Sequence, residues 1–250
     1  MARAFAGRTA LVTGGTSGIG LAIVTALSEA GAQVLVNSED AEACARVAAE
    51  TPGAVPLPAD LADADAVRDL ARDALALGRV HHLFANAGIT ARLRAGDPGY
   101  EAEVARVFAI NLHHVRLLCD AILPAMAAAG GGSAVLIASL SALRGNRDIG
   151  VYSLTKAALV QLTRDAAVHW GPATVRVNAL APGLIATGWE GAILSDPERA
   201  ERRMRMTPLR RIGQPHEIAA AALFLASDAA SFVTGQVLAV DGGTSITDGN

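Results

Sequence analysis

A tyrosine and a lysine four residues apart carry the most informative chemistry in this sequence. They are Tyr152 and Lys156, in the stretch VYSLTKAAL at residues 151–159. Lys156 is the only lysine among 21 lysines and arginines, so an ammonium group stands where the rest of the chain uses guanidinium groups. The segment is predicted to be helical, which places both side chains on one face. A nearby ammonium lowers the pKa of a phenol, ~10 in water, and this predicts an acid/base for a hydroxyl proton. The alternative is an ordinary surface pair on an amphipathic helix.

A glycine-rich loop follows the first predicted strand. The segment TGGTSGIG, residues 13–20, places Gly14, Gly18 and Gly20 in the spacing G-x-x-x-G-x-G, and a helix is predicted to begin at once. Glycines allow the backbone to approach a pyrophosphate closely, and a helix N-terminus offers oriented N–H groups. The pattern predicts a dinucleotide site, with a plain strand-to-helix turn as the alternative. Other residues expected to line this turn are Thr13, Thr16, Ser17 and Ile19.

Further polar residues lie where later predicted strands end, and one lies inside a predicted helix. A carboxylate after the third strand could accept a hydrogen bond from an adenine amino group, and a glycine after the fourth could admit a ribose. A hydroxyl after the fifth strand could bind a substrate oxygen. Each position alone is also explained by turn or cap chemistry. The residues are Asp60-Leu61, Asn86-Ala87-Gly88, Ser139 and, in the helical segment FAINLHHV, Asn111.

Short β-branched runs alternate with alanine-rich helical segments along the chain. This alternation predicts an α/β fold with a parallel sheet that is covered on both faces. Strands are expected at 9–14, 33–38, 53–58, 81–86, 133–139, 174–180 and 235–241, and helices at about 18–30, 40–50, 63–77, 100–129, 153–170 and 215–227. Residues 181–214 form a long insertion without a strand, and such a segment on the carboxyl edge of a sheet usually covers a ligand.

The combined motifs resemble those of the short-chain dehydrogenase/reductase family. The order and spacing match from the glycine loop to the final VDGG at 240–243, including the Tyr152-x-x-x-Lys156 pair and Pro182-Gly183 followed by Thr187. The resemblance implies a Rossmann-type, doubly wound, seven-stranded parallel sheet in a single domain, 1–250. It also implies hydride transfer between a nicotinamide and a carbonyl or secondary alcohol carbon. The apolar residues of the insertion suggest a substrate lid at 184–212 and a small, fairly apolar substrate.

The resemblance also implies a role for each matching residue. Tyr152 would be the general acid/base, and Lys156 would bind the nicotinamide ribose and depress the tyrosine pKa. Ser139 would orient the substrate oxygen, and Asn111 would hold a water that connects Lys156 to solvent. Contacts to the nicotinamide carboxamide are expected from Ile185 and Thr187. The family further implies a homotetramer, with the helices at 100–129 and 153–170 pairing across one interface and the C-terminal strand region at another.

Two departures from the family pattern concern structure and cofactor choice. The family often has two asparagines before the alanine-glycine pair, and here the first is Ala85. After the second strand the sequence reads Asn37-Ser38-Glu39, whereas NAD enzymes usually carry an acidic residue at the position of Ser38. Glu39 would repel the 2′-phosphate of NADP(H) and could reach the ribose hydroxyls instead, so we expect NAD(H) to be preferred over NADP(H). An arginine such as Arg46 that reaches the site would weaken this preference.

Composition disfavours other classes of function. A formal net charge of −3 and no basic stripe argue against nucleic acid, and the apolar run at 218–226 is too short to span a membrane. Cys44 and Cys119 have no metal or disulfide spacing, so we expect a cytoplasmic protein without a metal. A non-catalytic cofactor-binding regulator on the same fold remains an alternative, although such a protein would be expected to lack the tyrosine or lysine. Nucleotide-sugar epimerases and dehydratases are generally longer.

Several other residues have two interpretations. The pair His81-His82 is expected at a strand entry, and His113-His114 on a helix surface or subunit contact. The loop arginines are expected either on a solvated surface or at a pocket rim that favours an acidic substrate. Apolar residues of the insertion are expected either to form the lid or to pack on a neighbouring subunit. These loop arginines are Arg92, Arg94, Arg144 and Arg147, and the apolar residues are Trp189, Ile193, Leu194, Met204 and Met206.

Overall fold

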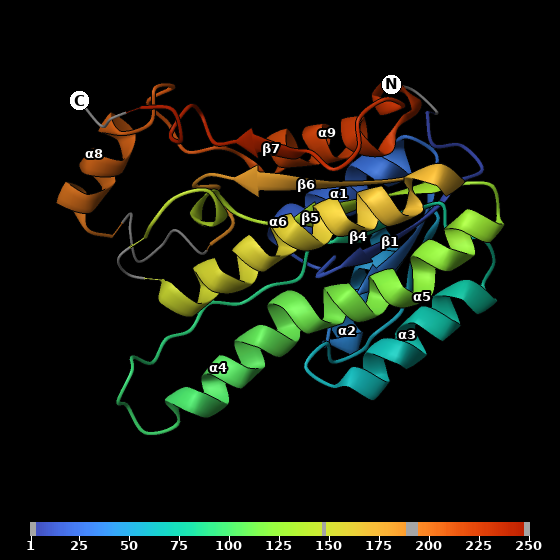
Figure 1. Cartoon of the computed structure of the whole chain (residues 1–250), viewed down its shortest axis with the longest axis horizontal. Helices are drawn as coiled ribbons and strands as arrows, with labels where there is room; N and C mark the ends of the chain where they lie inside the picture. Colours follow the sequence, from blue (N-terminus) through green and yellow to red (C-terminus); the bar gives the residue numbers. More distant parts are fainter. Residues whose placement is uncertain (1–3, 147–148, 189–194, 248–250) are drawn as a thin grey trace.

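The computed structural model describes residues 4–146, 149–188 and 195–247. Within them, seven parallel strands form one sheet in the order β3-β2-β1-β4-β5-β6-β7 (Figure 1). The order reverses between β1 and β4, as in the predicted Rossmann-type fold, and a ligand crevice is expected at the carboxyl ends of the strands near this reversal. The strands are β1 (Thr9–Thr13), β2 (Gln33–Asn37), β3 (Ala54–Pro56), β4 (His82–Ala85), β5 (Gly132–Ile137), β6 (Val175–Pro182) and β7 (Val237–Val240).

Helices cover both faces of the sheet, and each face has its own apolar core. The first core contains residues from α3, α5 and α6, and the second contains residues from α1, α2 and α9 (Figure 1). The main helices are α1 (Gly18–Glu29), α2 (Ala41–Glu50), α3 (Ala64–Ala76), α4 (Tyr100–Phe108), α5 (His114–Ala128), α6 (Gly150–Trp170), α8 (Pro197–Arg205) and α9 (Pro215–Ala226).

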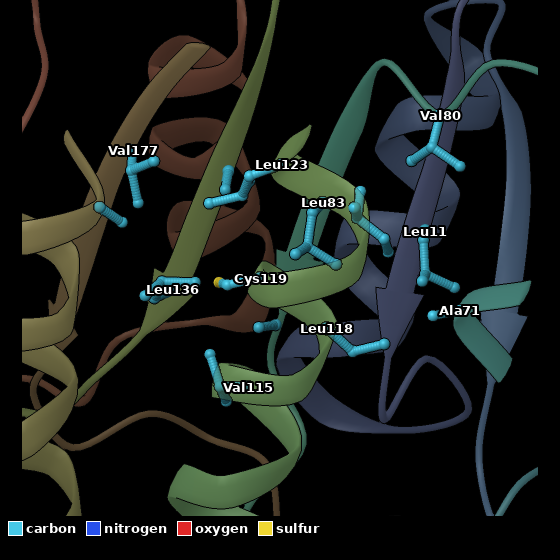
Figure 2. Packing of buried hydrophobic residues seen from close by; sticks show 14 of the residues in the cluster. Leu11, Ala71, Val80, Leu83, Val115, Leu118, Cys119, Leu123, Leu136 and Val177 are labelled. Atoms are coloured by element: carbon cyan, nitrogen blue, oxygen red, sulfur yellow. The ribbon is translucent and has the colours of Figure 1, made fainter. Parts of the chain in front are cut away.

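Helix α5 is the central helix of the first core. Its buried residues recur at helical spacing, and Figure 2 shows the side chains of Val115, Leu118 and Cys119 directed at the strands. They meet strand residues such as Leu83 and Leu136 in the same cluster. Burial of this stripe explains why the segment is helical despite Pro124 inside it. The packing holds the start of α5 at the carboxyl ends of β1 and β4.

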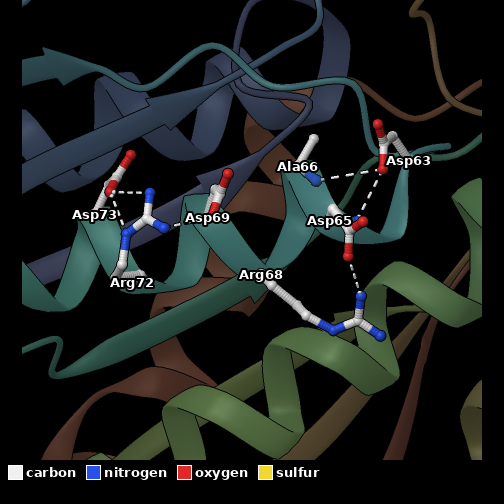
Figure 3. A network of polar contacts seen from close by, with 7 residues as sticks. All are labelled: Asp63, Asp65, Ala66, Arg68, Asp69, Arg72 and Asp73. Carbon is white, nitrogen blue, oxygen red and sulfur yellow. Dashed lines mark hydrogen bonds and ion pairs between the residues drawn. The ribbon is translucent and has the colours of Figure 1, made fainter.

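Helix α3 shows how exposed faces are stabilised by local pairs. The Asp63 side chain accepts hydrogen bonds from the N–H groups of Asp65 and Ala66 at the start of the helix. Arg68 then pairs with Asp65 three residues earlier, and Arg72 with Asp69 and Asp73 (Figure 3). Exposed pairs of this kind contribute little to the stability of the fold, so the buried face of α3 determines its position.

One predicted helix, 100–129, differs in detail. The structure divides it into α4 and α5, joined by a π-helical turn at Ala109–His113. The whole segment Tyr100–Ala128 is long and apolar enough to cross a membrane, and its most apolar 18 residues have a mean hydropathy of 1.2. Half of these 18 residues, however, are buried inside the protein. A core helix has the same composition, because it is apolar on the side that packs.

Candidate active site

Tyr152 and Lys156 lie one turn apart at the start of α6. The Lys156 Nζ atom is 5.7 Å from the centre of the Tyr152 ring, so the predicted shared face is present. The ammonium donates a hydrogen bond of 2.7 Å to the Ile137 carbonyl at the end of β5, and only 3% of the residue is exposed. A buried side chain with a fixed partner excludes the alternative of an ordinary surface pair for Lys156.

The electrostatics of this pair differ from the sequence-based expectation. Burial raises the pKa of Tyr152 above 10, and the hydrogen bond with Ser139 acts in the opposite direction. Burial also lowers the pKa of Lys156 to about 8. The pKa of Tyr152 is therefore raised and not lowered as predicted, because desolvation disfavours the charged form of both groups. Ser139 is the neighbour that stabilises the phenolate here.

Ser139 follows β5 and serves two purposes. Its hydroxyl interacts with Tyr152, and its Oγ atom also accepts hydrogen bonds from the Ser141 N–H at 3.2 Å and the Ser141 hydroxyl at 2.9 Å. The residue thus caps the short helical turn Leu140–Ala142 and faces the tyrosine as well. The two readings of Ser139 from sequence, a cap and a site hydroxyl, are compatible.

Asn111 is fully buried inside the π-helical turn. Its Oδ1 atom accepts from the Ile89 N–H at 2.8 Å, and its Nδ2 group donates to the Ile89 carbonyl at 2.8 Å and to the Thr155 hydroxyl at 3.1 Å. The side chain therefore fixes the loop after β4 against α6. Its predicted contact with a water that serves Lys156 stays a prediction.

The glycine loop has the shape that a dinucleotide needs. A Cβ atom on Gly20 would lie 1.9 Å from the Gly14 carbonyl oxygen, so the loop and the first turn of α1 touch as only glycine permits. Ser17, at the N-cap of α1, makes no side-chain cap hydrogen bond, which leaves N–H groups of the first turn available for an anion. Thr16 and Ile19 lie partly exposed on the same loop. These residues fit a pyrophosphate.

Two later segments contact this loop. Thr187 packs against it, since a Cβ atom on Gly18 would lie 3.2 Å from Thr187 Cβ. Asn86, after β4, donates from Nδ2 to the carbonyls of Thr13 and Gly14. Ala87 follows Asn86, and the next residue, Gly88, lies against the ammonium group of Lys156. A Cβ atom on Gly88 would lie 3.2 Å from Lys156 Nζ, so glycine provides the room for the ammonium.

The opposite end of the crevice contains Ser38 and Glu39. Glu39 is exposed and forms an ion pair with Arg106 of α4, with 3.4 Å between Oε2 and Nη2. The arginine considered from sequence, Arg46, pairs instead with Glu42 on its own helix. Asp60 is exposed and accepts from the Ala62 N–H, while the neighbouring Leu61 is buried.

The segment after β6 is only partly described. Pro182 ends β6, and Gly183 is tightly packed on Asp241. Ile185 is buried and pairs with Gly213 through an isolated parallel bridge, which closes the base of the insertion. Met204 and Met206, in and after α8, are partly buried. Trp189, Ile193 and Leu194 lie outside the described residues, as does Arg147.

Comparisons with known proteins decide the family. A family model described as enoyl-(acyl carrier protein) reductase matches residues 14–245. A galactitol 2-dehydrogenase (L-tagatose-forming) from Cereibacter sphaeroides is 43% identical over 244 residues, 96% of each chain. The chain belongs to the short-chain dehydrogenase/reductase family.

Solved structures of this family agree. A gluconate 5-dehydrogenase from Burkholderia cenocepacia in complex with NADP and tartrate superposes with a TM-score of 0.91, 33% identity and 98% coverage of each chain. A 7α-hydroxysteroid dehydrogenase with NADH and 7-oxo glycochenodeoxycholic acid gives 0.90 and 35%, covering 96% of this chain and 94% of that one. This short-chain dehydrogenase/reductase is accordingly an NAD(P)-dependent oxidoreductase that acts on alcohol and ketone groups.

Sequence reasoning missed two residues of this short-chain dehydrogenase/reductase. Arg106 gave no signal, because arginine is abundant and its contact with Glu39 joins elements far apart in the chain. His114 was expected on a helix surface or subunit contact together with His113, and for His114 this is wrong. Only 1% of it is exposed, and it points at the end of β1. His82 does begin β4, as expected for the other pair. Among the described residues, no group of three or more His, Cys, Asp or Glu could hold a metal ion.

Proposed function

We propose that Tyr152 is the general acid/base of this oxidoreductase, supported by Ser139, Lys156 and Asn111. The observation that carries the proposal is the phenol of Tyr152, hydrogen-bonded to Ser139, with the buried Lys156 ammonium next to it and against Gly88. In the reductive direction, Ser139 would hold the substrate oxygen while the tyrosine hydroxyl donates its proton to it. The nicotinamide, when bound, supplies or accepts the hydride. Asn111 keeps the surrounding loop and helix in place.

The same proposal assigns the cofactor contacts. The glycine loop and the N-terminus of α1 would bind the pyrophosphate, and Lys156 would donate to the ribose hydroxyls on the nicotinamide side. The residues after β2, β3 and β4 would surround the adenosine, and those after β6 the carboxamide. The proposed contact residues are Gly14, Thr16, Ser17, Gly18, Ile19, Gly20, Ser38, Glu39, Asp60, Leu61, Asn86, Ala87, Gly88, Tyr152, Lys156, Pro182, Gly183, Ile185 and Thr187.

We propose a slight preference for NAD(H), based on the charges at the adenosine end. Glu39 is exposed at the carboxyl end of β2, where a carboxylate repels a 2′-phosphate and attracts ribose hydroxyls. Arg106 beside it offsets part of that repulsion, so we expect the preference to be small. NADP in one solved relative and NADH in another fit a family in which this choice is made by a few residues.

The substrate we propose is a small, fairly apolar secondary alcohol or its ketone, covered by the segment 184–212 as a lid. Solved and curated relatives are named for substrates as different as galactitol, gluconate and a steroid, so the family alone does not choose among them. Arg144 donates to the Thr244 carbonyl, whereas Arg92 and Arg94 are exposed. The hydrogen bond of Arg144 is made to the backbone of the chain itself, which supports the proposal of an uncharged substrate.

The direct test is a screen of secondary alcohols and ketones, including galactitol and gluconate, with both nicotinamides and detection by absorbance. With an accepted substrate, Tyr152→Phe should lower turnover by ~10²-fold or more, because the proton donor is removed. Near-normal turnover of this variant would refute the assignment of Tyr152. Tight cofactor binding with no turnover on any substrate would favour the regulator.

We further propose a cytoplasmic homotetramer with no membrane or nucleic-acid partner. Large apolar side chains are exposed on α6 and near the C-terminus, including Leu154, Val168, Phe232 and Ile246. A hollow of about 380 Å³ lies between α5 and α6, lined partly by Leu123, Leu162 and Trp170. In the proposed tetramer, apolar side chains such as these would be buried between subunits. A monomer in light scattering at micromolar concentration would contradict this assembly.

A further inference from the structure

The two adjacent histidines at the start of α5 have opposite environments. His113 is exposed and its ring meets that of Phe108 edge to face, with 6.3 Å between ring centres. His114 is buried at the carboxyl ends of β1 and β4. A buried imidazole costs free energy unless both nitrogens have partners. The roles assigned above to Tyr152, Lys156, Ser139 and Asn111 do not use it.

Both nitrogens of His114 have partners, and the direction of each hydrogen bond can be worked out. Burial lowers the pKa of His114 to about 3, so the ring is neutral near pH 7. Its Nδ1 atom faces the Ile110 carbonyl, which can only accept, so the ring proton is on Nδ1. Nε2 is then an acceptor and lies 3.4 Å from Thr13 Oγ1.

The Thr13 hydroxyl fits this assignment. Its oxygen accepts from the N–H groups of Asn86 at 3.0 Å and Ala87 at 3.1 Å. Its own proton is therefore the donor that remains for His114 Nε2. The hydrogen bonds run in one direction, from the end of β4 through Thr13 and His114 to the Ile110 carbonyl.

These bonds join two parts of the site that are far apart in the chain. Ile110 belongs to the π-helical turn that carries Asn111. The backbone N–H of His114 closes the same turn by donating to the Ala109 carbonyl. Thr13 directly precedes the glycine loop, and Ala87 precedes Gly88, which backs onto Lys156 Nζ. One side chain thus connects the turn that bears Asn111 to the floor of the cofactor site.

We propose that His114 is a positioning residue that holds the π-helical turn against Thr13 and thereby sets the place of Asn111, Gly88 and Lys156 around the cofactor. The proposal rests on the proposed function, because it is defined by the residues that would bind the nicotinamide ribose. It assigns no proton transfer to His114. Even without a ligand, it states that hydrogen bonds through His114 and Thr13 connect the ends of β1 and β4 to the π-helical turn.

The test is a double-mutant cycle read by NADH fluorescence titration. In His114→Leu the Thr13 hydroxyl loses its buried acceptor, so the π-helical turn is no longer held against Thr13. Because Gly88 and Lys156 would then be misplaced, NADH binding should weaken by ~10-fold. Thr13→Val removes the other end of the link. In the Thr13→Val background, His114→Leu should therefore weaken binding by less than about twofold, since one link cannot be broken twice. His113→Leu is the matched control and should bind NADH as the wild type does.

A second readout reports on the lysine itself. Because Lys156 is the only lysine, protein grown with 13Cε-labelled lysine gives one lysine resonance. This resonance should move in His114→Leu and stay in place in His113→Leu. Should His114→Leu fail to fold, His114→Asn serves in its place, because its amide can still donate to Ile110 without reaching Thr13.

Two outcomes would overturn the proposal. One is wild-type NADH affinity and an unmoved lysine resonance in a folded His114 variant. The other is an equal loss of affinity from His114→Leu with and without Thr13→Val, which would indicate packing alone. Either outcome leaves the proposed function intact, since that function is tested separately by turnover of Tyr152→Phe.

Discussion

Glu39→Gln should shift the cofactor preference of this enzyme toward NADP(H). Glu39 and Arg106 face each other at 3.4 Å, with 64% and 48% of their side chains exposed. The carboxylate repels a 2′-phosphate and the guanidinium attracts it, so the wild type holds two opposing charges at one place. Removal of the carboxylate leaves Arg106 free for the phosphate.

The expected size follows from the charges. A phosphate with about two negative charges, about 6 Å from a carboxylate in water-like surroundings, is repelled by about 1.4 kcal/mol, a factor of about ten in affinity. Glu39→Gln should therefore tighten NADP(H) binding by ~10-fold relative to NAD(H), and Glu39→Arg by ~100-fold. Arg106→Gln should weaken NADP(H) binding relative to NAD(H) by ~10-fold, because Arg106 is expected to lie about as far from the phosphate as Glu39 does.

The assay is fluorescence titration with NADH and NADPH, at low and at physiological salt. Both shifts should shrink as salt rises, because the side chains are exposed. Arg46→Gln is the matched control, since Arg46 is also exposed but pairs with Glu42. A ratio that stays within twofold of the wild type in Glu39→Gln would show that Glu39 does not face the 2′-position. NADPH binding that survives Arg106→Gln unchanged would show that another cation holds the phosphate.

Two further predictions concern the lysine and the glycine loop. NADH binding should weaken as pH rises above about 8, where buried Lys156 loses its proton, and Lys156→Arg should bind more weakly but without this pH dependence. Between about pH 8 and 9 the unfolded chain keeps the proton that buried Lys156 has lost, so the free energy of unfolding should rise with pH there, as urea titration can show. Above pH 9 the thiols of Cys44 and Cys119, whose pKa values burial raises, act in the opposite direction. NADH affinity of the wild type that does not change between pH 7 and 9 would contradict the assignment of Lys156. Gly20→Ala should lower stability by about 1–3 kcal/mol and disturb NADH binding, because its Cβ would lie 1.9 Å from the Gly14 oxygen. Gly171→Ala, with nothing within 4 Å of the added atom, should change neither, and equal melting of both variants would refute the packing argument.

Much of the fold follows from local patterns in the sequence. All seven predicted strands are present within a few residues of their expected bounds, because a buried parallel strand must be continuously apolar and such runs stand out in the sequence. Candidate site residues such as Ser139 and Asn86 could be located at one edge of the sheet because they follow strand ends, and parallel strands bring their carboxyl ends to one edge. Tyr152 and Lys156 were visible through their spacing on one helix.

The remainder depended on contacts that no local pattern encodes. The π-helical turn has no periodicity signal of its own, and it changes the surroundings of Asn111 and His114. The pairing of Glu39 with Arg106 requires the relative placement of α4 and β2. The pKa values of Tyr152 and Lys156 are set mainly by burial, which depends on the whole of the packed core.

The π-helical turn also sets the rotational phase between two helices. Successive residues of an α-helix are about 100° apart around its axis, so one extra residue in a turn rotates everything before it by about that angle relative to everything after it. α5 is fixed in phase by its buried stripe, which includes Val115 and Leu118. Deletion of one residue from Ala109–His113 would therefore leave α5 in register and turn α4 by about a quarter of a revolution, carrying Arg106 away from Glu39. The extra residue of the π-helical turn beside Asn111 therefore fixes the side of α4 that faces Glu39, and with it the charge that Arg106 presents there.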